Sequence, residues 1–562
     1  MKKIWLDSYP PGIPAEVEFR AAGSLVDLLA RSCARYRDRR AFVSMGAHLT
    51  YAGLDRLSRD FGASLEHELG LRQGERIAIM LPNILQYPVA LFGALRAGLT
   101  VVNVNPLYTA TELGRQLADC GARAIVVLEN FAHTLEKALG ADTGLHVITT
   151  QLGDLFPPTK RALVNVVVKH VKRMVPRWRI AHAMPLREAL ARGRRHALTD
   201  VEVRPEDLAF LQYTGGTTGR PKGAMLTHRN VAANVEQTIA WIGSALTPGE
   251  ETVVTALPLY HIFALTANLF VFVRLGGTNL LIANPRDLTA FVATLTKSRF
   301  TAITGVNTLY GALLDAPGFA AVCAARRGTL KIAVAGGMAV QRAIAERWQA
   351  ATGIPLIEGY GLTEASPNVC CNRFDAREFS GTVGLPLPST EVAILDERGN
   401  DAPLGELGEI CVRGPQVMQG YWNAPEETAK TFTAEGWLRT GDLGRMDARG
   451  YVSFHDRRKD VIVVSGFKAY PVEIEEVARS HPGVADAGAV GVPDARSGES
   501  VMLYVVRRDP GLTAEALLEH CARHLTAYKL PRRIEFRAQL PKTPIGKVSR
   551  RELREEAIRA HG

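Results

Sequence analysis

The sequence predicts an α/β fold with largely parallel sheets, divided into more than one domain. Its 562 residues exceed the size of about 250–300 residues at which single hydrophobic cores usually stop growing. Hydrophobic residues make up 47% of the chain and charged residues 22%, which is typical of a soluble globular protein. From about residue 25 to residue 285, helical patterns alternate with short β-branched runs. This alternation favours parallel sheets covered by helices.

The first elements of this region can be placed individually. "LVDLLARSCARY", from Leu25, has the apolar spacing of an amphipathic helix. Four short apolar runs predict buried strands: "RIAIMLPN" from Arg76, "AIVVL" from Ala124, "HVITT" from His146 and "TVVTALPL" from Thr252. Later, "EVAILDERGN" and "GEICVRGPQVMQGYW" indicate a more antiparallel, turn-rich section.

The pattern changes after the charged run "DRRKD", residues 456–460. The tail from "YPVEIEEVARS" to "SVMLYVVRR" predicts a helix followed by two strands, in a unit of about 100 residues, which is a normal domain size. We therefore predict an N-terminal domain over residues 1–457, a hinge over 458–460 and a C-terminal domain over 461–562.

The stretch "YTGGTTGRPKGAMLTH", Tyr213 to His228, is too rich in glycine and polar residues to pack a core. Its backbone amides, hydroxyls and cations provide the environment that phosphate oxygens need. It is not a Walker loop, because Gly219 is followed by Arg-Pro-Lys. Taken alone, "GGTTG" fits a surface hairpin equally well.

The whole stretch resembles the phosphate-binding signature of the adenylate-forming superfamily, which comprises acyl-CoA synthetases, adenylation domains and luciferases. The block Gly436–Asp460 is similar to the fatty-acyl-CoA synthetase signature, and "LPLYHIFALT" and "VNVNPLYTATEL" resemble bacterial long-chain fatty acid CoA ligases. The resemblance covers essentially the entire chain. Four further segments match in the expected order: "EGYGLTEASP" from Glu358, "GWLRTGDL" from Gly436, "DRRKDVIVVSGFKAYPVEIE" from Asp456 and "LPKTPIGKVSRREL" from Leu540.

This resemblance implies both a fold and a reaction. The fold is a large N-terminal domain of layered α/β subdomains, with two mostly parallel sheets and a distorted β-barrel, and a small mobile α+β C-terminal domain. The reaction is the ATP- and Mg²⁺-dependent joining of a long-chain fatty acid to coenzyme A. The carboxylate first forms acyl-AMP and releases pyrophosphate, and the thiol of CoA then displaces AMP. Because two anions must meet, catalysis should depend on positioning and charge neutralisation.

The resemblance also implies roles for individual residues. Lys547 would bridge the attacking carboxylate and the α-phosphate of ATP. Glu364 would bind Mg²⁺, a hard ion that prefers carboxylate oxygen, and Thr363 would contact the α-phosphate. Asp442 would accept both ribose hydroxyls, since one carboxylate can take two donors, and Arg457 would add a second ribose contact.

The remaining nucleotide contacts fall in two glycine-rich groups. The first departs from the family at one position, because Gly215 stands where serine is common, which leaves the threonines and the backbone amides to hold phosphate. This phosphate loop comprises Tyr213, Thr214, Gly215, Gly216, Thr217, Thr218, Gly219 and Lys222. The second group would surround the adenine and comprises Gly336, Gly337, Gly359, Tyr360 and Gly361, although Tyr360 is also compatible with a core position.

The second half-reaction needs a different arrangement of the same site. The resemblance implies that the C-terminal domain swings about Lys459. In one pose Lys547 enters the site, and in the other the "VVSGFK" segment opens a channel for CoA. The residues expected along that channel are Ser465, Gly466 and Phe467.

The acyl group should have its own pocket. His261, in "LPLYHIFALT", aligns with an aromatic gate between the acyl pocket and the CoA channel. We expect a slot for the acyl chain past "TAITGVNTLYGALL", where Gly305 and Gly311 would leave room beside the backbone. The preferred chain length cannot be obtained from these residues.

The charge of the chain indicates its partners. A net charge of +10 favours anionic partners, but no basic–aromatic motif suggests nucleic acid. Residues 160–176, "KRALVNVVVKHVKRMVP", predict a basic amphipathic helix that could contact anionic lipid, although such helices usually cover the protein's own core. Its run Val166–Val168 is a weak helix former. The seven scattered cysteines favour a reducing cytoplasm, and a dimer is compatible with the sequence.

Three alternatives remain. A fatty acyl-AMP ligase would deliver its product to a carrier protein, but those relatives often carry an insertion near the hinge that this chain lacks. An amino-acid adenylation domain would need an acidic residue after the phosphate loop, for which only Glu236 is available. A non-enzymatic lipid- or nucleotide-binding protein would not need Lys547, Glu364 and Asp442 together.

Overall fold

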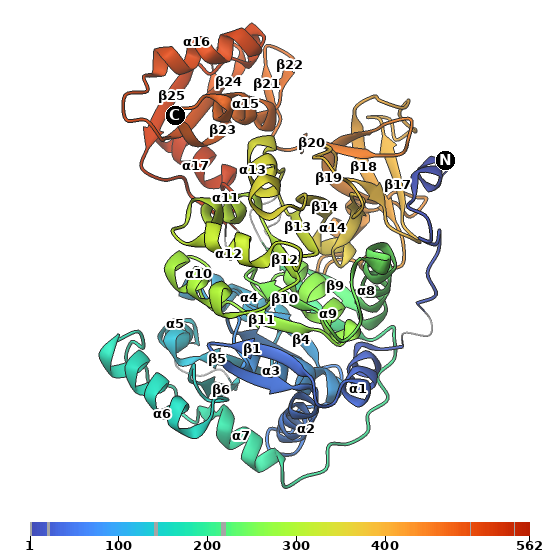
Figure 1. Ribbon diagram of the computed structural model, residues 1–562, viewed down its shortest axis with the longest axis vertical. Coiled ribbons are helices and arrows are strands. Elements are labelled where there is room, and N and C mark those ends of the chain that lie inside the picture. Colours follow the sequence, from blue (N-terminus) through green and yellow to red (C-terminus); the bar gives the residue numbers. More distant parts are fainter. Residues whose placement is uncertain are drawn as a thin grey trace.

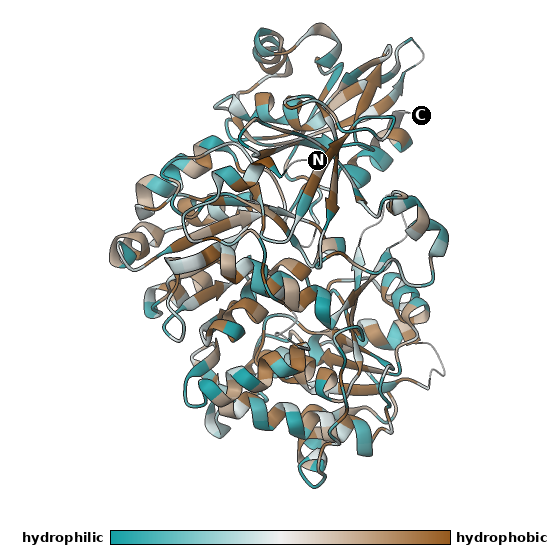
Figure 2. Cartoon of the chain, turned by 90° about the vertical axis from the view of Figure 1, so that its right-hand side faces the viewer, coloured by the Kyte–Doolittle hydropathy of each residue, from teal (hydrophilic) through white to brown (hydrophobic). Residues whose placement is uncertain are grey.

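Two large sheets, a smaller antiparallel sheet and a separate C-terminal sheet build the computed structural model (Figure 1). The structure describes residues 3–19, 23–139, 144–214, 221–494, 496–543 and 546–561. Strands are predominantly hydrophobic, whereas most helices carry both hydrophobic and hydrophilic residues (Figure 2). This is the distribution expected for helices that cover sheets with one face.

The first large sheet has seven strands in the order β7-β6-β5-β3-β4-β8-β9. Every neighbouring pair is parallel except β8 and β9, which form an antiparallel hairpin. Three strands predicted from the sequence, β3, β5 and β6, are confirmed. The strands are β3 (Arg76–Met80), β4 (Thr100–Asn103), β5 (Ala124–Leu128), β6 (His146–Thr150), β7 (Met184–Pro185), β8 (Leu208–Thr214) and β9 (Lys222–Thr227).

The second large sheet has nine strands in the order β16-β15-β14-β13-β12-β10-β11-β1-β2. The pairs from β14 to β1 are parallel, and antiparallel pairs close both edges. The predicted strand at Thr252 is β10. The strands are β1 (Arg40–Ser44), β2 (Ala47–Thr50), β10 (Thr252–Thr255), β11 (Thr278–Leu281), β12 (Ala302–Gly305), β13 (Ile332–Gly336), β14 (Ile357–Gly361), β15 (Asn368–Cys371) and β16 (Leu385–Pro386).

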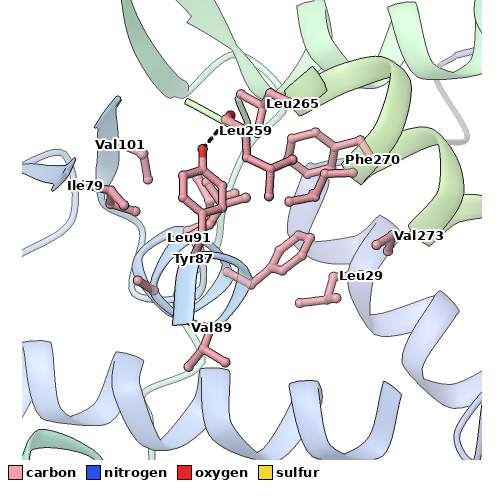
Figure 3. Close-up of a cluster of buried hydrophobic side chains, with 14 of the residues drawn as sticks. Leu29, Ile79, Tyr87, Val89, Leu91, Val101, Leu259, Leu265, Phe270 and Val273 are labelled. Atoms are coloured by element: carbon pink, nitrogen blue, oxygen red, sulfur yellow. Dashed lines mark hydrogen bonds between the residues drawn. The ribbon is translucent and has the colours of Figure 1, made fainter. Parts of the chain in front are cut away.

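Helices cover both sheets and form a shared core between them. The predicted helix at Leu25 is α1, which begins at a capping box formed by Ser24 and Asp27. In the core, Tyr87 donates its hydroxyl to the carbonyl of Leu259 over 2.8 Å and lies near Phe270 (Figure 3). The helices are α1 (Leu25–Arg35), α2 (Tyr51–His67), α3 (Gln86–Arg96), α4 (Ala110–Cys120), α5 (Glu129–Leu139), α7 (Leu186–Gly193), α8 (His228–Ile242), η5 (Ala264–Phe270), α9 (Val271–Leu275), α10 (Leu288–Lys297), α11 (Asn307–Asp315), α12 (Phe319–Arg326) and α13 (Arg342–Thr352).

The turn-rich section forms a four-stranded antiparallel sheet in the order β17-β18-β19-β20. Among the described residues this order does not return to β17, so an open sheet stands where a distorted barrel was expected. The strands are β17 (Glu391–Leu395), β18 (Gly408–Arg413), β19 (Leu438–Met446) and β20 (Val452–Arg457), and helix α14 (Pro425–Thr431) precedes β19.

The C-terminal part has its own sheet and its own core. β20 ends at Arg457, and the next strand begins only at Ile462. The predicted order of a helix followed by two strands is confirmed as α15, β23 and β24. The elements are β21 (Ile462–Val464), β22 (Phe467–Ala469), α15 (Pro471–Ser480), β23 (Val484–Asp494), β24 (Gly498–Arg507), α16 (Ala514–His524), β25 (Arg533–Arg537) and α17 (Arg550–His561).

The segment predicted as one helix over residues 160–176 is shorter than expected. It forms α6 (Pro158–Val166), continues as a π-helix, η3 (Val167–Val171), and ends at Lys172. The wider turns begin within the β-branched run, whose side chains crowd a regular α-helix. Arg173 then takes a positive φ of 50°.

The helix α6 turns its polar side toward the protein. Asn165 accepts a hydrogen bond from the N–H of Gly153 over 2.8 Å, and the ammonium of Lys169 lies 3.3 Å from Glu129. The apolar side faces outward, and α6 lies at the edge of the molecule (Figure 1). The exposed fractions are 65% for Leu163 and 52% for Val166 in α6, 70% for Val171 in η3, and 53% for Met174 after η3.

Among the described residues, no single helix is long and apolar enough to cross a membrane. The bent pair α11 and α12 meets the length and composition criteria only when the two helices are taken together. Both helices contribute to the core of the nine-stranded sheet, through Tyr310, Leu313, Phe319 and Val322.

Candidate active site

A cavity of about 2890 Å³ lies where the large sheets, the antiparallel sheet and the C-terminal domain meet. Most of the residues singled out in the sequence line it, although they come from distant segments. Those residues are Tyr213, Thr214, Lys222, His261, Gly336, Gly337, Gly359, Tyr360, Gly361, Thr363, Glu364, Asp442, Arg457, Lys459 and Lys547. Five others lie outside the described residues: Gly215, Gly216, Thr217, Thr218 and Gly219.

The hairpin of β8 and β9 holds the two ends of the phosphate loop together. Thr214 pairs with Lys222 at the end of the hairpin, so both reach the cavity. The ammonium of Lys222 lies 2.5 Å from a carboxylate oxygen of Glu427 and 5.1 Å from the ring centre of Tyr421. Lys222 therefore supplies a positive charge at this edge of the cavity.

Glycines of adjacent strands form a flat wall. Gly336 on β13 pairs with Gly359 on β14, and a Cβ at Gly336 would lie 3.0 Å from the ring of Phe263. A Cβ at Gly361 would lie only 2.2 Å from the carbonyl oxygen of Pro367, so no larger residue fits there. Such a wall leaves space for a planar group against the backbone.

Tyr360, Asp442 and Arg457 form a hydrogen-bonded group at one side of the wall. The hydroxyl of Tyr360 donates to Asp442 over 2.7 Å, and Nε of Arg457 lies 3.5 Å from the other carboxylate oxygen. Asp442 and Arg457 are neighbours because β19 and β20 pair at these residues. Burial raises the pKa of Asp442, and the charge of Arg457 opposes that rise. Tyr360 is mostly buried and also packs in the core, so its core and cavity positions coincide.

Glu364 lies in a short helical turn, Thr363–Ala365, that follows β14. Its carboxylate accepts the hydroxyl of Tyr421 over 2.7 Å, and burial raises its pKa. The structure groups no three His, Cys, Asp or Glu residues suitably for a metal in the part of the chain that it describes. A Mg²⁺ ion at Glu364 would therefore take its other ligands from substrate phosphates and water, as is usual for this ion.

Lys547 reaches the cavity from the C-terminal domain. A tight turn carries it, in which the N–H of Thr543 donates to the carbonyl of Lys547 over 2.7 Å. Gly546 has a φ of +83°, and a Cβ there would lie 3.0 Å from the hydroxyl of Thr308, so glycine lets this turn approach α11. Burial and the nearby charge of Arg457 lower the pKa of Lys547 to about 8.

His261 and Lys459 line the same cavity. Burial, with a smaller effect from the Lys547 ammonium, lowers the pKa of His261 to about 4, so its ring is neutral at pH 7. Burial also lowers the pKa of Lys459. Of these two residues, His261 is close enough to Lys547 for the charge of that lysine to affect its pKa.

The hairpin of β21 and β22 does not line the cavity. Phe467 is 59% exposed and stacks on Tyr528 at a ring distance of 5.1 Å. Ser465 and Gly466 form the turn of this hairpin, and neither they nor Phe467 are among the residues that line the cavity. The structure thus places Lys547 in the site and leaves the expected CoA-channel residues outside it.

One arm of the cavity is apolar. Strand alternation places Ala302 and Thr304 of β12 and Ile332 and Val334 of β13 on the face that lines it. Gly305 and Gly311, beside which a slot for the acyl chain was expected, are not among the residues that line the cavity. A Cβ at Gly305 would lie 2.9 Å from the ring of Tyr310, and one at Gly311 would lie 3.3 Å from Ile344, so neither glycine opens the cavity. The arm also has the side chains of Trp241, Ile242, Phe263, Ala267, Phe272, Cys370, Cys371 and Phe374.

Three cavity residues were not identified from the sequence. Tyr421 contacts both Glu364 and Lys222, and Glu427 pairs with Lys222. Glu358 is buried with one carboxylate oxygen unpaired, and burial raises its pKa to about 8. Glu358 opens the "EGYGLTEASP" motif and Tyr421 lies in "QGYW", but only the fold shows that they face the cavity.

Glu236, considered as a contact for an amino-acid substrate, does not line the cavity. Its carboxylate is paired with the guanidinium of Arg274, at 2.7 Å from Nε. Glu236 is therefore not available in the cavity to bind the amino group of an amino-acid substrate.

Comparison with known proteins agrees with this geometry. A model described as AMP-binding enzyme matches residues 29–422, and one described as AMP-binding enzyme C-terminal domain matches residues 473–547. Among solved structures, the anthranilate CoA ligase AuaEII in complex with anthranoyl-AMP has a TM-score of 0.82 and 25% identity, covering 96% of this chain and 98% of its own. A benzoate CoA ligase from Burkholderia xenovorans LB400 has a TM-score of 0.80 and 27% identity, covering 94% and 99%.

Curated relatives are similar over their whole length. A long-chain-fatty-acid–CoA ligase of Escherichia coli O6:H1 is 54% identical, covering 99% of both chains. Ligases with the same name from Yersinia pestis and Bacillus subtilis are 51% and 36% identical, each covering 100% of this chain and 99% of the relative. The fold is that of an adenylate-forming enzyme. Within that class, the chain belongs to the AMP-binding enzyme family.

Proposed function

We propose that this protein is an AMP-forming long-chain fatty acid:CoA ligase that uses ATP, Mg²⁺ and coenzyme A. The observation that carries the proposal is one cavity in which apolar side chains, the partly buried Lys547 and the residues expected to bind the nucleotide all meet. Curated relatives with this activity in their names match the whole chain, which supports the same substrate class.

In the first half-reaction, the cavity binds ATP and the fatty acid side by side. The phosphate loop and Lys222 hold the phosphates, the glycine wall accommodates adenine, and Asp442 with Arg457 binds the ribose. A carboxylate oxygen of the acid attacks the α-phosphorus, the bond to the β-phosphate oxygen breaks, and pyrophosphate leaves. Lys547 lies between the two anions and reduces their repulsion. Glu364 would hold Mg²⁺, which neutralises phosphate charge when bound, and Thr363 contacts the α-phosphate.

The second half-reaction uses the other pose of the C-terminal domain. The domain turns about Lys459, Lys547 leaves, and the hairpin with Ser465, Gly466 and Phe467 forms a channel for CoA. The thiol sulfur attacks the acyl carbon, the bond to the AMP oxygen breaks, and the thiol proton is released. His261, neutral at pH 7, gates the passage between the arm and this channel. The domain division at residues 457 and 461 stays a prediction, which is supported by the gap between β20 and β21.

The apolar arm receives the acyl chain. Each buried methylene contributes about 0.8 kcal/mol, so a long acid gains most of its affinity there. We expect AMP release with acids of four to eighteen carbons to increase with chain length and to require CoA. AMP formation that does not need CoA but needs a carrier protein would instead indicate an acyl-AMP ligase. Failure to exchange pyrophosphate into ATP with palmitate would contradict adenylation altogether.

Substitutions at Val334 test whether the apolar residues of the cavity set the preferred chain length of the acid. Val334 is partly buried and is one of the apolar residues that line the cavity. Val334→Phe should fill the arm and reduce activity on long acids while sparing short ones, whereas Val334→Ala should not shorten the preferred chain. Pockets of this kind discriminate one methylene by about 10–200-fold, so the shift is measurable as a ratio of kcat/KM values.

The outward apolar side of α6 and η3 supports a peripheral contact with a lipid surface. Helices that only cover a core turn their apolar side inward. Here Val164 packs against the core and Asn165 bonds inward to Gly153, but Leu163, Val166 and Val171 are exposed. Exposed Lys172 and Arg173 lie between Val171 and Met174 in the sequence, and their charges suit anionic headgroups. The contact would bring the cytoplasmic enzyme to the membrane in which its substrate dissolves. The cytoplasmic location and a dimer both stay predictions.

We expect the variant Leu163→Ser/Val171→Ser to bind anionic vesicles more weakly than the wild type. The variant Lys172→Glu/Arg173→Glu should lower the affinity for these vesicles by about tenfold or more, since each basic residue near the surface contributes about 1 kcal/mol. Sedimentation with vesicles measures both. Leu404→Ser is the matched control, because Leu404 is 55% exposed on a distant loop. Activity on a soluble acid should stay unchanged, and equal vesicle binding by all variants would contradict the contact.

A further inference from the structure

Asp456 is the last buried carboxylate of the N-terminal domain before the hinge. It lies on β20 and is fully buried. Its carboxylate accepts one hydrogen bond from its own strand, donated by the N–H of Arg457 over 2.7 Å, and its other partners belong to the C-terminal domain. This position is unusual, because a buried charge is costly unless it is paired and hydrogen-bonded.

The first partner of Asp456 is the beginning of helix α15. The N–H of Val472 donates to the Asp456 carboxylate over 2.8 Å. Tyr470, at the N-cap position of α15, makes no capping hydrogen bond of its own. Asp456 therefore supplies, from the other domain, the acceptor that a capping residue usually provides, and its charge suits the positive end of the helix dipole.

The second partner is Arg550, at the beginning of helix α17 and three residues after Lys547. Its guanidinium lies 3.0 Å from Asp456 and 3.4 Å from Asp460. The other side of the guanidinium pairs with both carboxylate oxygens of Glu475 at 2.8 Å. Glu475 is itself fixed by the N–H of Ala489 over 3.0 Å and lies 3.3 Å from Arg479.

These contacts divide at the hinge. Arg550, Glu475 and Asp460 all follow Lys459, so they move together when the C-terminal domain turns. Asp456 precedes Lys459 and stays with β20. A turn of the domain would therefore break the bonds from Asp456 to Val472 and Arg550, while Arg550 keeps its pair with Glu475 and is not left as an uncompensated charge.

We propose that Asp456 is a positioning residue that holds the C-terminal domain in the pose in which Lys547 enters the cavity. It caps α15 and pairs with Arg550 in this pose only, and so favours the first half-reaction over the second. The inference rests on the proposed function, because it requires the two half-reactions to use different poses about Lys459.

The test separates the half-reactions in Asp456→Asn. This variant keeps the size of the side chain and loses the charge. We expect acyl-AMP formation, measured as pyrophosphate exchange, to fall by roughly 10- to 100-fold, the value of a hydrogen bond to a charged group. Thioester formation from supplied acyl-AMP and CoA should be unchanged or faster. Arg550→Lys, which keeps the charge but loses the forked geometry, should act in the same direction.

A matched control is Asp55→Asn. Asp55 also pairs with a buried arginine, since its carboxylate lies 2.5 Å from Arg96, but both residues belong to the N-terminal domain. This variant should lower thermal stability without changing the ratio of the two half-reactions. Equal slowing of both half-reactions by Asp456→Asn, or slowing of neither, would overturn the inference.

A second measurement reports the pose directly. Lys468 on β22 and Glu397 of the N-terminal domain lie 2.6 Å apart and are both exposed. Cysteines at these two positions should be joined rapidly by a short bifunctional maleimide, and Asp456→Asn should slow that reaction. Unchanged cross-linking would also overturn the inference. If the unmodified enzyme formed no acyl-AMP, the proposed function would fail instead, so the two failures are distinguishable.

Discussion

Lys547→Ala should lower the rate of acyl-AMP formation by about 10²–10³-fold, as the loss of one preorganised charge donor typically does. The lysine is partly buried in the cavity, near the charges of Arg457 and Asp442. Thioester formation from supplied acyl-AMP and CoA should be largely intact, because Lys547 leaves the cavity for that step. Pyrophosphate exchange and thioester formation, measured separately, test this split.

The pH dependence of the same step gives an independent signature. The pKa of Lys547 is lowered to about 8, so its ammonium loses the proton as the pH rises through that value. Two bound anions favour the protonated form, so substrate binding should take up a proton. With ATP below saturation, adenylation should therefore decrease above about pH 8, and the residual activity of Lys547→Ala should lack this decrease.

Lys529→Ala is the control for Lys547→Ala. Lys529 is also a lysine of the C-terminal domain, but its ammonium pairs with Glu473 at 2.7 Å and does not line the cavity. It should leave both half-reactions near the wild-type rates. Equal loss of both half-reactions in Lys547→Ala would refute the role of that lysine.

The fold could be predicted where local pattern and burial agree. The strands at Arg76, Ala124 and His146 are short apolar runs in a parallel sheet buried on both faces, so their composition alone identifies them. The π-helical turns after Val166 arise because β-branched side chains crowd a regular α-helix. The sequence indicated only that Val166–Val168 is a weak helix former. The order of strands in each sheet depends on contacts between distant segments, which no local pattern contains.

In the site, too, contacts between residues far apart in the sequence could not be predicted. The predicted residues that the structure describes line one cavity, apart from the hairpin around Phe467, which the present pose leaves outside. On β12, Ala302 and Thr304 line the cavity rather than Gly305, next to which the acyl slot was expected, because alternate residues of a strand face the same side. Tyr421, Glu427 and Asp456 act through partners far away in the sequence, so only the folded chain shows their contacts.

Lys459→Pro should preserve acyl-AMP formation and slow thioester formation by about 10²-fold or more, the loss expected when reacting groups are held out of position. Proline fixes φ at about −65° and so removes the rotation that the second pose requires. The substitution removes neither hinge hydrogen bond, since these are donated by the N–H groups of Arg458 and Asp460, to Gly441 at 2.9 Å and to Arg457 at 3.0 Å.

Lys459→Ala isolates the backbone effect in this experiment. It removes the same side chain, which is exposed and lines the cavity, but leaves φ free. Thioester formation should therefore be much slower in the proline variant than in the alanine variant, and acyl-AMP should accumulate only with proline when CoA is present. Full turnover by Lys459→Pro would mean that the domain turns about another residue. If the hinge lay before Asp456, Asp456 would move together with Val472 and Arg550. Its contacts with them would then lie within the C-terminal domain and would not be broken when that domain turns.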